Sequence, residues 1–297
     1  MKTSLAQKVL RLSLSFISLY QSIRGKRIIN NPVVLCYHNV GYDTWNFTIS
    51  PKSLTEQLTW VKQSARVVPV SQIQKYQKKK ESVVAVSFDD GYRSMLTRAD
   101  AIVKKLEIQP MLFILGNPKK ANRVQLDNKL PLLTISEMRK LIKKNWEIGY
   151  HTNTHADLST LSAAELYIEV ISSKEIIENQ LSIKIDYFAY PRGIYDEKVN
   201  RLMKRTPYKL AFTVDGGSVN GSPDSKHIQR VCFEGKLELH QFQALMSKPG
   251  LLFYRAFMKA LKIKEKQTRR IRNWRTLFKK QTFSKIKLSK LDLKINL

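Results

Sequence analysis

Cysteine is scarce in this sequence, and long apolar runs are missing. Cys36 and Cys232 are the only cysteines among 297 residues, too few for a disulfide framework or a structural zinc site. No stretch reaches the roughly 18–20 apolar residues that a membrane-spanning helix needs. With 43% hydrophobic residues, 11 glycines and 10 prolines, the composition excludes a disordered or collagen-like chain. The length suits one large globular domain or two small ones.

Acidic residues are scarce at both ends of the chain. Residues 1–30 contain six Lys/Arg and no acid, and residues 251–297 contain fifteen Lys/Arg against two acids. The segment between them holds 31 basic and 22 acidic residues, so most of the net charge of +28 lies in the two tails. A fold that is basic throughout is typical of a nucleic-acid binder. Two basic tails on an ordinary body instead favour an enzyme held at an anionic surface.

We therefore predict a basic amphipathic segment at 1–30, a catalytic domain at 31–245 and a basic amphipathic tail at 246–297. The first segment resembles a signal peptide, but serines interrupt its apolar core and no A-x-A-like cleavage site follows. We expect it to be retained, with cleavage as the alternative. In the tail, basic residues recur at helical spacing from Arg255 to Lys266, and Trp274 adds an interfacial aromatic. This pattern predicts a helix on an anionic membrane, with a solvated tail or single-strand nucleic-acid binding as alternatives.

Short apolar runs alternate with helix-like stretches in the middle of the chain. Most runs lack polar alternation, as is typical of strands covered on both faces. This alternation predicts a parallel α/β fold, and about seven strands in about 215 residues favour a small (β/α) barrel. The expected strands are Pro32–Tyr37, Arg66–Val70, Ser82–Phe88, Met111–Leu115, Glu147–Tyr150, Ile185–Tyr190 and Leu210–Val214.

Three helices are expected to begin with a capping box, a serine or threonine followed three residues later by glutamate. The candidates are Ser53 with Glu56, Thr134 with Glu137 and Ser162 with Glu165. The last is predicted to begin a long helix, ending near Leu181, whose core contacts are Leu166, Val170, Ile176, Ile177 and Leu181.

Two aspartates follow directly after the strand predicted at Ser82–Phe88. In a barrel, polar residues at the carboxyl ends of strands face the active site. Asp89 and Asp90 would repel each other there unless a cation or a proton intervened. A simple turn is the alternative, since Asp90-Gly91 is a common turn dipeptide.

Two histidines follow the strand predicted at Glu147–Tyr150. His151 and His155 fall on one side of a turn and can chelate one ion, although two polar loop histidines are the alternative. They are two of only five histidines in the chain. Two histidines and one aspartate make a three-ligand catalytic metal set with open positions for water and substrate. The second aspartate is then a natural general base.

Two further strand ends carry candidate residues. Pro191, Arg192 and Gly193 follow one strand, and their tight turn can present the Arg192 backbone N–H to an oxyanion, with a simple loop as the alternative. His38 follows the first strand and can protonate a leaving amine, unless it is a hydrogen-bonded structural histidine. His240 is a weaker candidate for that acid.

Three segments together resemble the motifs of the polysaccharide deacetylase family (NodB-homology domain, carbohydrate esterase family 4). They are Ser87-Phe-Asp-Asp-Gly91, His151-Thr-Asn-Thr-His155 and Phe188-Ala-Tyr-Pro-Arg-Gly193. The resemblance covers about 32–235 and implies a distorted (β/α)7 barrel that binds one divalent metal ion. Zinc is the first choice for this ion, with cobalt or nickel as alternatives, because such a site accepts several divalent ions. By the same resemblance Asp90, His151 and His155 match the metal ligands and Asp89 the catalytic base.

Two positions depart from the family pattern. Many members have an arginine after the Phe of the third motif, where it orients the base, and this chain has Ala189. This alanine and the pair Tyr37-His38 resemble the subgroup of poly-N-acetylglucosamine deacetylases, in which that histidine is the candidate acid. Arg192 stands where an aromatic residue often follows the proline, and it can bind an acidic sugar or a phosphate. We expect Tyr190, Pro191 and Arg192 to contact the substrate.

The resemblance implies a hydrolase that removes N-acetyl groups from N-acetylhexosamine residues of a polysaccharide or lipid-linked glycan. O-deacetylation or deformylation of an amino sugar is the alternative within the same chemistry. A non-catalytic barrel that binds glycan or nucleic acid is the alternative class. We expect a glycan substrate, contact of both basic tails with an anionic membrane and no nucleic-acid partner. The expected location is the cytoplasmic side of the bacterial inner membrane, with export as the alternative.

Overall fold

The computed structural model describes residues 5–24, 31–126 and 129–262. The chain divides into two compact units, residues 1–255 and residues 256–297, and the fold described below belongs to the first. Residues 256–262, the described part of the second unit, are helical. The predicted membrane-binding positions Lys266 and Trp274 lie outside the described residues.

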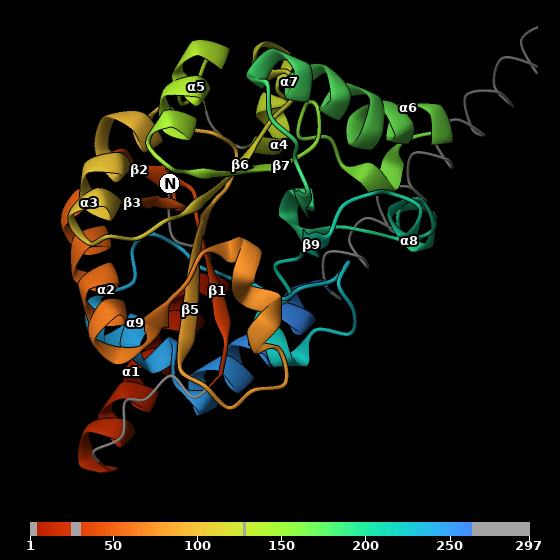
Figure 1. Ribbon diagram of the computed structural model, residues 1–297. Helices are drawn as coiled ribbons and strands as arrows, with labels where there is room; N and C mark the ends of the chain where they lie inside the picture. The colour runs from red at the N-terminus through yellow and green to blue at the C-terminus, as the bar shows by residue number, and fades with distance from the viewer. Residues whose placement is uncertain (1–4, 25–30, 127–128, 263–297) are drawn as a thin grey trace, which may run out of the picture. The chain divides into compact units, whose positions relative to one another are not determined.

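Parallel strands curl into a barrel in the first unit (Figure 1). Seven of them follow one another in the order β10-β1-β5-β6-β7-β8-β9, and β4 pairs with β5 outside this row. This arrangement confirms the predicted distorted (β/α)7 barrel. The strands are β1 (Val33–Tyr37), β2 (Asn39–Val40), β3 (Thr48–Ile49), β4 (Arg66–Val67), β5 (Val83–Phe88), β6 (Met111–Ile114), β7 (Glu147–Tyr150), β8 (Tyr187–Ala189), β9 (Leu210–Phe212) and β10 (Val231–Cys232).

The segment 228–232 closes the barrel. At its start Ile228 forms a parallel bridge with Phe212 of β9, and its backbone exchanges hydrogen bonds with that strand. At its end Val231 and Cys232 pair with β1. These five residues therefore connect β9 to β1 and complete the ring of strands.

Helices surround the sheet, and their bounds follow the chain. The α-helices are α1 (Leu5–Arg24), α2 (Pro51–Ser64), α3 (Asp100–Lys105), α4 (Arg123–Leu126), α5 (Ile135–Lys143), α6 (Ala163–Tyr167), α7 (Ser173–Leu181), α8 (Glu197–Lys204) and α9 (Leu239–Leu245). The other helical turns are η1 (Val70–Tyr76), η2 (Met95–Ala99), η3 (Pro118–Lys120), η4 (Leu158–Thr160), η5 (Ile168–Ser172), η6 (Pro191–Gly193) and η7 (Val219–Gly221). Residues 248–262 are also helical.

Apolar side chains from alternate strand positions fill the barrel. Val34, Ala85, Phe113 and Phe212 belong to one buried cluster, which also includes apolar residues of η1. Gly149 in β7 makes this packing possible, because a Cβ there would lie 2.3 Å from the ring of Phe113. The interior is thus a packed core, and polar chemistry is confined to the strand ends.

The strand predictions hold for β1, β5, β6, β7, β8 and β9 within three residues at either end. The prediction at Arg66–Val70 is too long, because Pro69 precedes the η1 turn and β4 ends at Val67. The sequence reasoning missed β10, which has only two residues and follows an arginine.

Two of the three predicted capping boxes are present, at Thr134 and Ser162. The prediction at Ser53 is wrong, because α2 begins at Pro51 and Ser50 caps it by accepting a hydrogen bond from the Ser53 N–H. The helical run from residue 163 to 181 exists, with a π-helical stretch at η5. Of its five predicted core contacts, Ile176 is exposed and the other four are buried.

Helix α1 packs against α9. Gln241 donates a hydrogen bond to the Ser15 hydroxyl, Arg11 pairs with Glu234, and Leu10 and Leu14 are buried. Among the described residues no helix combines the length and the apolarity that crossing a bilayer requires. The predicted N-terminal amphipathic segment thus forms a helix that covers the barrel unit with one face.

Candidate active site

The barrel strands end at one edge, and candidate residues follow several of them. His38 follows β1, Asp89 follows β5 and His151 follows β7. The register aligns these ends, because Tyr37 pairs with Phe88 across β1 and β5. Parallel strands place their carboxyl ends on the same side, so the three residues meet there.

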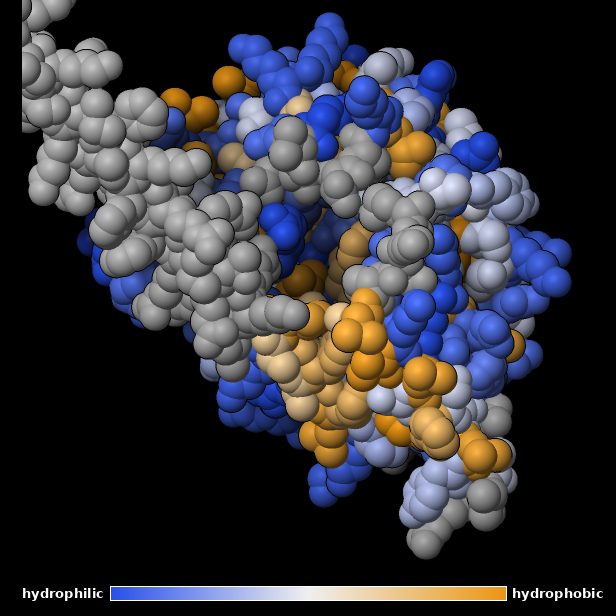
Figure 2. Space-filling view, turned by 180° about the vertical axis from the view of Figure 1, so that it is seen from behind, coloured by the Kyte–Doolittle hydropathy of each residue, from blue (hydrophilic) through white to orange (hydrophobic). Residues whose placement is uncertain are grey.

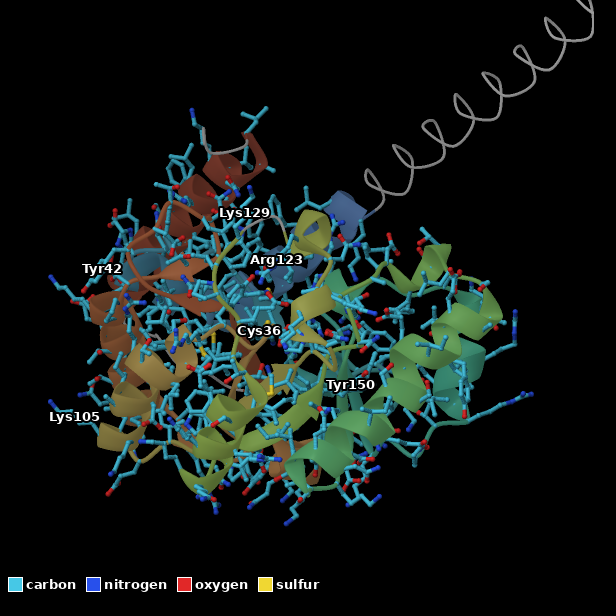
Figure 3. All side chains as sticks on the ribbon, turned by 90° about the horizontal axis from the view of Figure 1, so that it is seen from above. Cys36, Tyr42, Lys105, Arg123, Lys129 and Tyr150 are labelled. Atoms are coloured by element: carbon cyan, nitrogen blue, oxygen red, sulfur yellow. The ribbon has the colours of Figure 1, made fainter. Side chains whose placement is uncertain are left out.

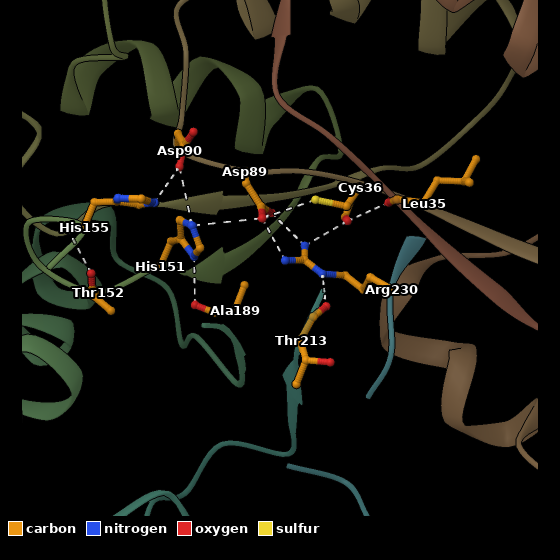
Figure 4. A network of polar contacts seen from close by, with 11 residues as sticks. Leu35, Cys36, Asp89, Asp90, His151, Thr152, His155, Ala189, Thr213 and Arg230 are labelled. Carbon is orange, nitrogen blue, oxygen red and sulfur yellow. Dashed lines mark hydrogen bonds and ion pairs between the residues drawn. The ribbon is translucent and has the colours of Figure 1, made fainter. Parts of the chain in front are cut away.

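Asp90, His151 and His155 come together as predicted (Figure 4). The Asp90 Oδ1 atom lies 3.4 Å from Nε2 of His151 and 3.4 Å from Nε2 of His155. All three side chains are buried, and one ligand atom of each lies within 4.8 Å of the other two. We refer to these residues as the metal trio.

The hydrogen bonds of the metal trio fit a cation. His151 Nδ1 lies 2.7 Å from the Ala189 carbonyl oxygen, so Nδ1 carries the proton and Nε2 presents its lone pair. Within the described residues the buried Asp90 Oδ1 has no hydrogen-bond donor. Buried polar atoms are rarely left without partners, and a bound cation would satisfy this oxygen together with both Nε2 atoms.

The pKa values of the two histidines differ. Burial lowers the pKa of His155 to about 4, so this imidazole is neutral at physiological pH. Burial acts in the same direction on His151, but Asp89 and Asp90 outweigh it and raise the pKa of His151 above its usual value. A divalent cation between the three side chains would supply the positive charge that these carboxylates favour.

The backbone at the metal trio adopts left-handed conformations. Asp90 has φ 71°, Thr152 has φ 69° and His155 has φ 62°. Such values are uncommon outside glycine and persist where the surrounding contacts impose them. Here the Thr152 hydroxyl accepts a hydrogen bond of 3.0 Å from the His155 N–H, which fixes the turn between the two histidines.

Glu169 holds the histidine loop from outside. Its carboxylate accepts hydrogen bonds from the N–H groups of Asn153 and Thr154 at 2.9 Å each and from the Thr154 hydroxyl at 2.7 Å. Glu169 lies in the π-helical turn η5, a kind of distortion often found near functional sites. The sequence reasoning missed this residue, because a glutamate in a helix gives no sign that it faces inward.

Arg230 binds the other aspartate. Its Nη1 and Nη2 atoms each donate to one oxygen of Asp89 at 2.7 Å, a bidentate pair in a fully buried setting. Nη1 also donates to the Ser87 hydroxyl and Nε to the Thr213 carbonyl oxygen. Burial is the largest single influence and would raise the pKa of Asp89, but the charge and hydrogen bonds of Arg230 and the charges of His151 and His38 together hold this pKa below its usual value.

Arg230 therefore supplies the arginine that the third motif lacks at Ala189. It precedes β10, far from that motif in sequence, which is why the motif search could not find it. The available signal was an arginine followed directly by the apolar run Val231-Cys232-Phe233. Because both Asp89 oxygens are occupied on the Arg230 side, the carboxylate has a fixed orientation toward His151, whose Nε2 lies 4.0 Å away.

The two candidate acids lie in different places. His38 packs its ring against Trp45 and Phe47, and its charge interacts with those of both site aspartates. Burial lowers the pKa of His38, and the aspartates oppose this effect. His240 lies in α9, pairs with Glu238 and contacts Ser15 of α1, so the structure does not bring it to the metal trio.

The third motif forms the turn η6. Tyr190 is fully buried, and its hydroxyl donates to the Lys226 carbonyl oxygen at 2.9 Å, which favours a structural role over substrate contact. Pro191 is also buried. Arg192 has an exposed side chain and φ 56°, so among these three residues its side chain is the one that solvent reaches.

The family model for polysaccharide deacetylase matches residues 76–211, a range that includes Asp89, Asp90 and both metal-trio histidines. Over this range the chain is similar to the polysaccharide deacetylase family. It is 24% identical over 194 residues to YxkH of Bacillus subtilis, covering 65% of this chain and 60% of YxkH. It is 22% identical over 226 residues to the poly-beta-1,6-N-acetyl-D-glucosamine N-deacetylase of Staphylococcus aureus, covering 71% of this chain and 76% of that enzyme.

Solved structures of deacetylases share the fold. The Streptococcus pyogenes deacetylase PplD, in complex with acetate, aligns with a TM-score of 0.63 at 20% identity, covering 73% of this chain and 98% of PplD. IcaB from Ammonifex degensii aligns with a TM-score of 0.59 at 20% identity, covering 77% of this chain and 97% of IcaB. The barrel therefore has the same fold as these two solved deacetylases, over nearly the whole length of each.

Proposed function

We propose that this protein is a polysaccharide deacetylase that removes N-acetyl groups from N-acetylhexosamine residues of a polysaccharide or lipid-linked glycan. The main support is the metal trio beside an aspartate that Arg230 orients. Asp90, His151 and His155 would hold one divalent cation, with zinc as first choice and cobalt or nickel as alternatives. When bound, such an ion would supply Lewis-acid polarisation of the amide carbonyl and would lower the pKa of a coordinated water.

Asp89 is the proposed general base. Arg230 lowers its pKa and leaves the carboxylate ionised, so that it can accept a proton from the water that attacks the acetamide. His38 is the proposed acid that gives a proton to the departing amine. Because burial lowers its pKa, His38 depends on the charges of Asp89 and Asp90 to hold that proton.

The choice of an N-acetylated glycan is supported by the relatives. The Staphylococcus aureus relative is named for N-deacetylation of poly-beta-1,6-N-acetyl-D-glucosamine. The exposed Arg192 side chain is proposed to contact the glycan. If Arg192→Tyr leaves the preference between charged and neutral glycans unchanged, this contact is wrong.

The test is acetate release from N-acetylglucosamine oligomers. The full chain is stripped with a chelator and then supplied with zinc or cobalt. We expect release only with the metal, and in Asp89→Asn a loss of at least about a hundredfold with one metal ion still bound per chain. Asp186→Asn is the matched control, because this aspartate pairs with Lys209 at the surface.

Three results would contradict the proposal. Metal-independent release would exclude the metal mechanism. Release from O-acetylated or N-formylated sugars alone would favour the alternative acyl group. Absence of both release and metal binding would favour a glycan-binding barrel.

We also propose that the enzyme works at an anionic membrane, on the cytoplasmic side of the inner membrane. Helix α1 supports this, because its outward face carries large apolar residues that are 45–79% exposed, namely Leu5, Val9, Leu12, Phe16, Leu19 and Tyr20. They recur at intervals of three and four residues and form one stripe. In Figure 2 apolar atoms extend along the lower right, where α1 lies.

The positive charge of α1 indicates that this apolar stripe contacts a lipid surface and not a second copy of the chain. Helix α1 has no acidic residue and carries the exposed Lys8 beside the stripe, whereas the Arg11 charge is paired with Glu234. Two such positive faces would repel each other, whereas an anionic bilayer attracts both and accepts the apolar side chains. The predicted basic residues beyond residue 262 would add to this attraction.

Vesicle co-sedimentation tests the membrane proposal. We expect binding to vesicles with anionic lipid, weaker binding to neutral vesicles, and a loss of about tenfold or more in Phe16→Glu. The control is Tyr167→Glu, which alters an exposed apolar residue on α6 instead. Equal binding of both variants, or dimerisation that Phe16→Glu abolishes, would contradict the lipid assignment.

A further inference from the structure

A second cluster of potential ligands lies beside the metal trio. Cys36 in β1 and His38 two residues later point to the same side of the strand. Cys232 in β10 is the parallel partner of Cys36. The two sulfur atoms and one ring nitrogen of His38 all lie within 4.8 Å of one another. We call these three residues the thiol cluster.

The thiol cluster lies inside the barrel unit. Figure 3 shows Cys36 within the ring of helices and strands, far from peripheral residues such as Tyr42 and Lys105. Cys36 is fully buried and donates to Asp89 Oδ2 at 3.3 Å (Figure 4). Cys232 is half-buried and is the more accessible of the two cysteines.

The spacing of the thiol cluster suits one thiophilic ion. With zinc–sulfur distances of about 2.3 Å and zinc–nitrogen distances of about 2.0–2.1 Å, tetrahedral ligand atoms lie roughly 3.5–3.8 Å apart. Because the ligand atoms lie within 4.8 Å of one another, side-chain rotations that close at most about 1.3 Å bring them to coordination spacing. Two thiolates and one imidazole also form a known catalytic type of zinc set, which leaves one position open.

The charges around the thiol cluster permit a cation. The nearby positive charge of Arg230 is neutralised by its bidentate pair with Asp89. The buried Nδ1 of His38 has no hydrogen-bond partner within the described residues. Tyr254 donates to the Cys232 carbonyl oxygen and fixes the strand that presents this thiol.

We propose that Cys36, His38 and Cys232 form a second metal site, for a thiophilic ion such as zinc or cadmium. Its donor set differs from that of the metal trio, because sulfur selects softer metals than carboxylate does. Binding the ion engages His38. Excess thiophilic metal therefore inhibits deacetylation, and this consequence, unlike the site itself, rests on the proposed acid role of His38.

The test uses the reduced full chain, stripped of metal and titrated with cadmium or cobalt. We expect two ions per chain and a sulfur-to-metal charge-transfer band in the near ultraviolet. Cys232→Ser should remove the band and leave one ion, because the metal trio is untouched. Asp90→Ala should keep the band and lose the other ion. The affinity of the second ion should fall by more than the 10–100-fold typical of outer-shell changes.

Two results would overturn the second site. One is a wild-type titration that ends at one ion without a charge-transfer band. The other is a band that persists in both Cys36→Ser and Cys232→Ser. Serine at position 36 keeps a donor toward Asp89 and position 232 is half-buried, so both variants should fold.

Activity in excess zinc separates the site from the acid role of His38. We expect inhibition of the wild type at metal concentrations at least about tenfold below those that inhibit Cys232→Ser. If the band forms but catalysis continues unchanged, the thiol cluster stands and the acid role of His38 is wrong. If acetate release is absent under all conditions while the band forms, the proposed function fails and the metal site remains.

Discussion

On two sides of the same barrel edge, buried charged groups differ in how many hydrogen bonds they make. On the β5–β7 side, the metal trio leaves buried atoms such as Asp90 Oδ1 without hydrogen-bond donors in the described residues. On the β1–β10 side, Arg230 donates to Asp89, Ser87 and Thr213, and its guanidinium also lies 5.0 Å from the centre of the Phe113 ring. The comparison indicates that a group reserved for a ligand lacks hydrogen-bond donors, whereas the positioning group Arg230 makes four hydrogen bonds through its guanidinium.

The largest effect is expected at Asp90. In Asp90→Ala we expect metal binding to be lost and turnover to fall at least about a thousandfold, because the ion supplies several kcal/mol of transition-state stabilisation. The free energy of unfolding should fall by only about 1–2 kcal/mol, the cost of alanine in a left-handed conformation. Metal analysis, acetate release and denaturant unfolding measure these quantities, with Asp186→Ala as control. Retained metal stoichiometry would refute the ligand assignment.

The second-largest effect is expected at Arg230. In Arg230→Met we expect about 3–5 kcal/mol of lost stability, because Asp89 becomes a buried, unpaired charge. The pKa of Asp89 should rise, so the acid limb of the pH–rate profile moves to higher pH. Arg230→Lys keeps the charge but loses the bidentate pair, and it should restore the acid limb with incomplete activity.

The number of bound metal ions shows whether an Arg230 variant affects Asp89 alone or the metal trio as well. Both Arg230 variants should still bind one ion at the metal trio. An acid limb that does not move in Arg230→Met would mean that Arg230 serves the fold alone and does not position the base.

The smallest effect is expected at Glu169. Glu169→Gln weakens three hydrogen bonds to the histidine loop, so metal affinity should fall about 10–100-fold while Asp89 is unaffected. Competition with a chelator measures this affinity. Glu165→Gln is the control on the preceding helix, because it alters a capping box away from the loop. Equal affinities in the two variants would show that the loop holds its shape without the charge of Glu169.

The metal trio could be predicted because its members lie in two short segments. Asp90 follows one continuous apolar run, and His151 and His155 follow another. Runs of this kind identify buried strands, and the strand ends then locate the residues. The fold could be predicted for the same reason, since six of the seven barrel strands are such runs.

The features that the sequence did not predict depend on contacts between segments that are distant along the chain. Arg230 meets Asp89 across 141 positions, and β10 exists only because β1 lies beside it. Ser50 caps α2 in place of the predicted Ser53, because Pro51 directly after Ser50 begins the helix. The substrate prediction for Tyr190 rested on its place in a motif, and its burial became visible only once Phe188 and His227 were seen to pack around it.

Metal binding and the proposed activity depend on different parts of the chain, because Arg230 lies in the closing segment 228–232 and the metal trio does not. The metal trio follows β5 and β7, which pair with β6 between them, and these pairings do not involve residues 228–232. Arg230, which binds the proposed base Asp89, lies in the segment 228–232 that joins β9 to β1. A preparation with an open ring would then be loaded with metal and yet inactive, so titrating metal alone overstates the fraction of working enzyme.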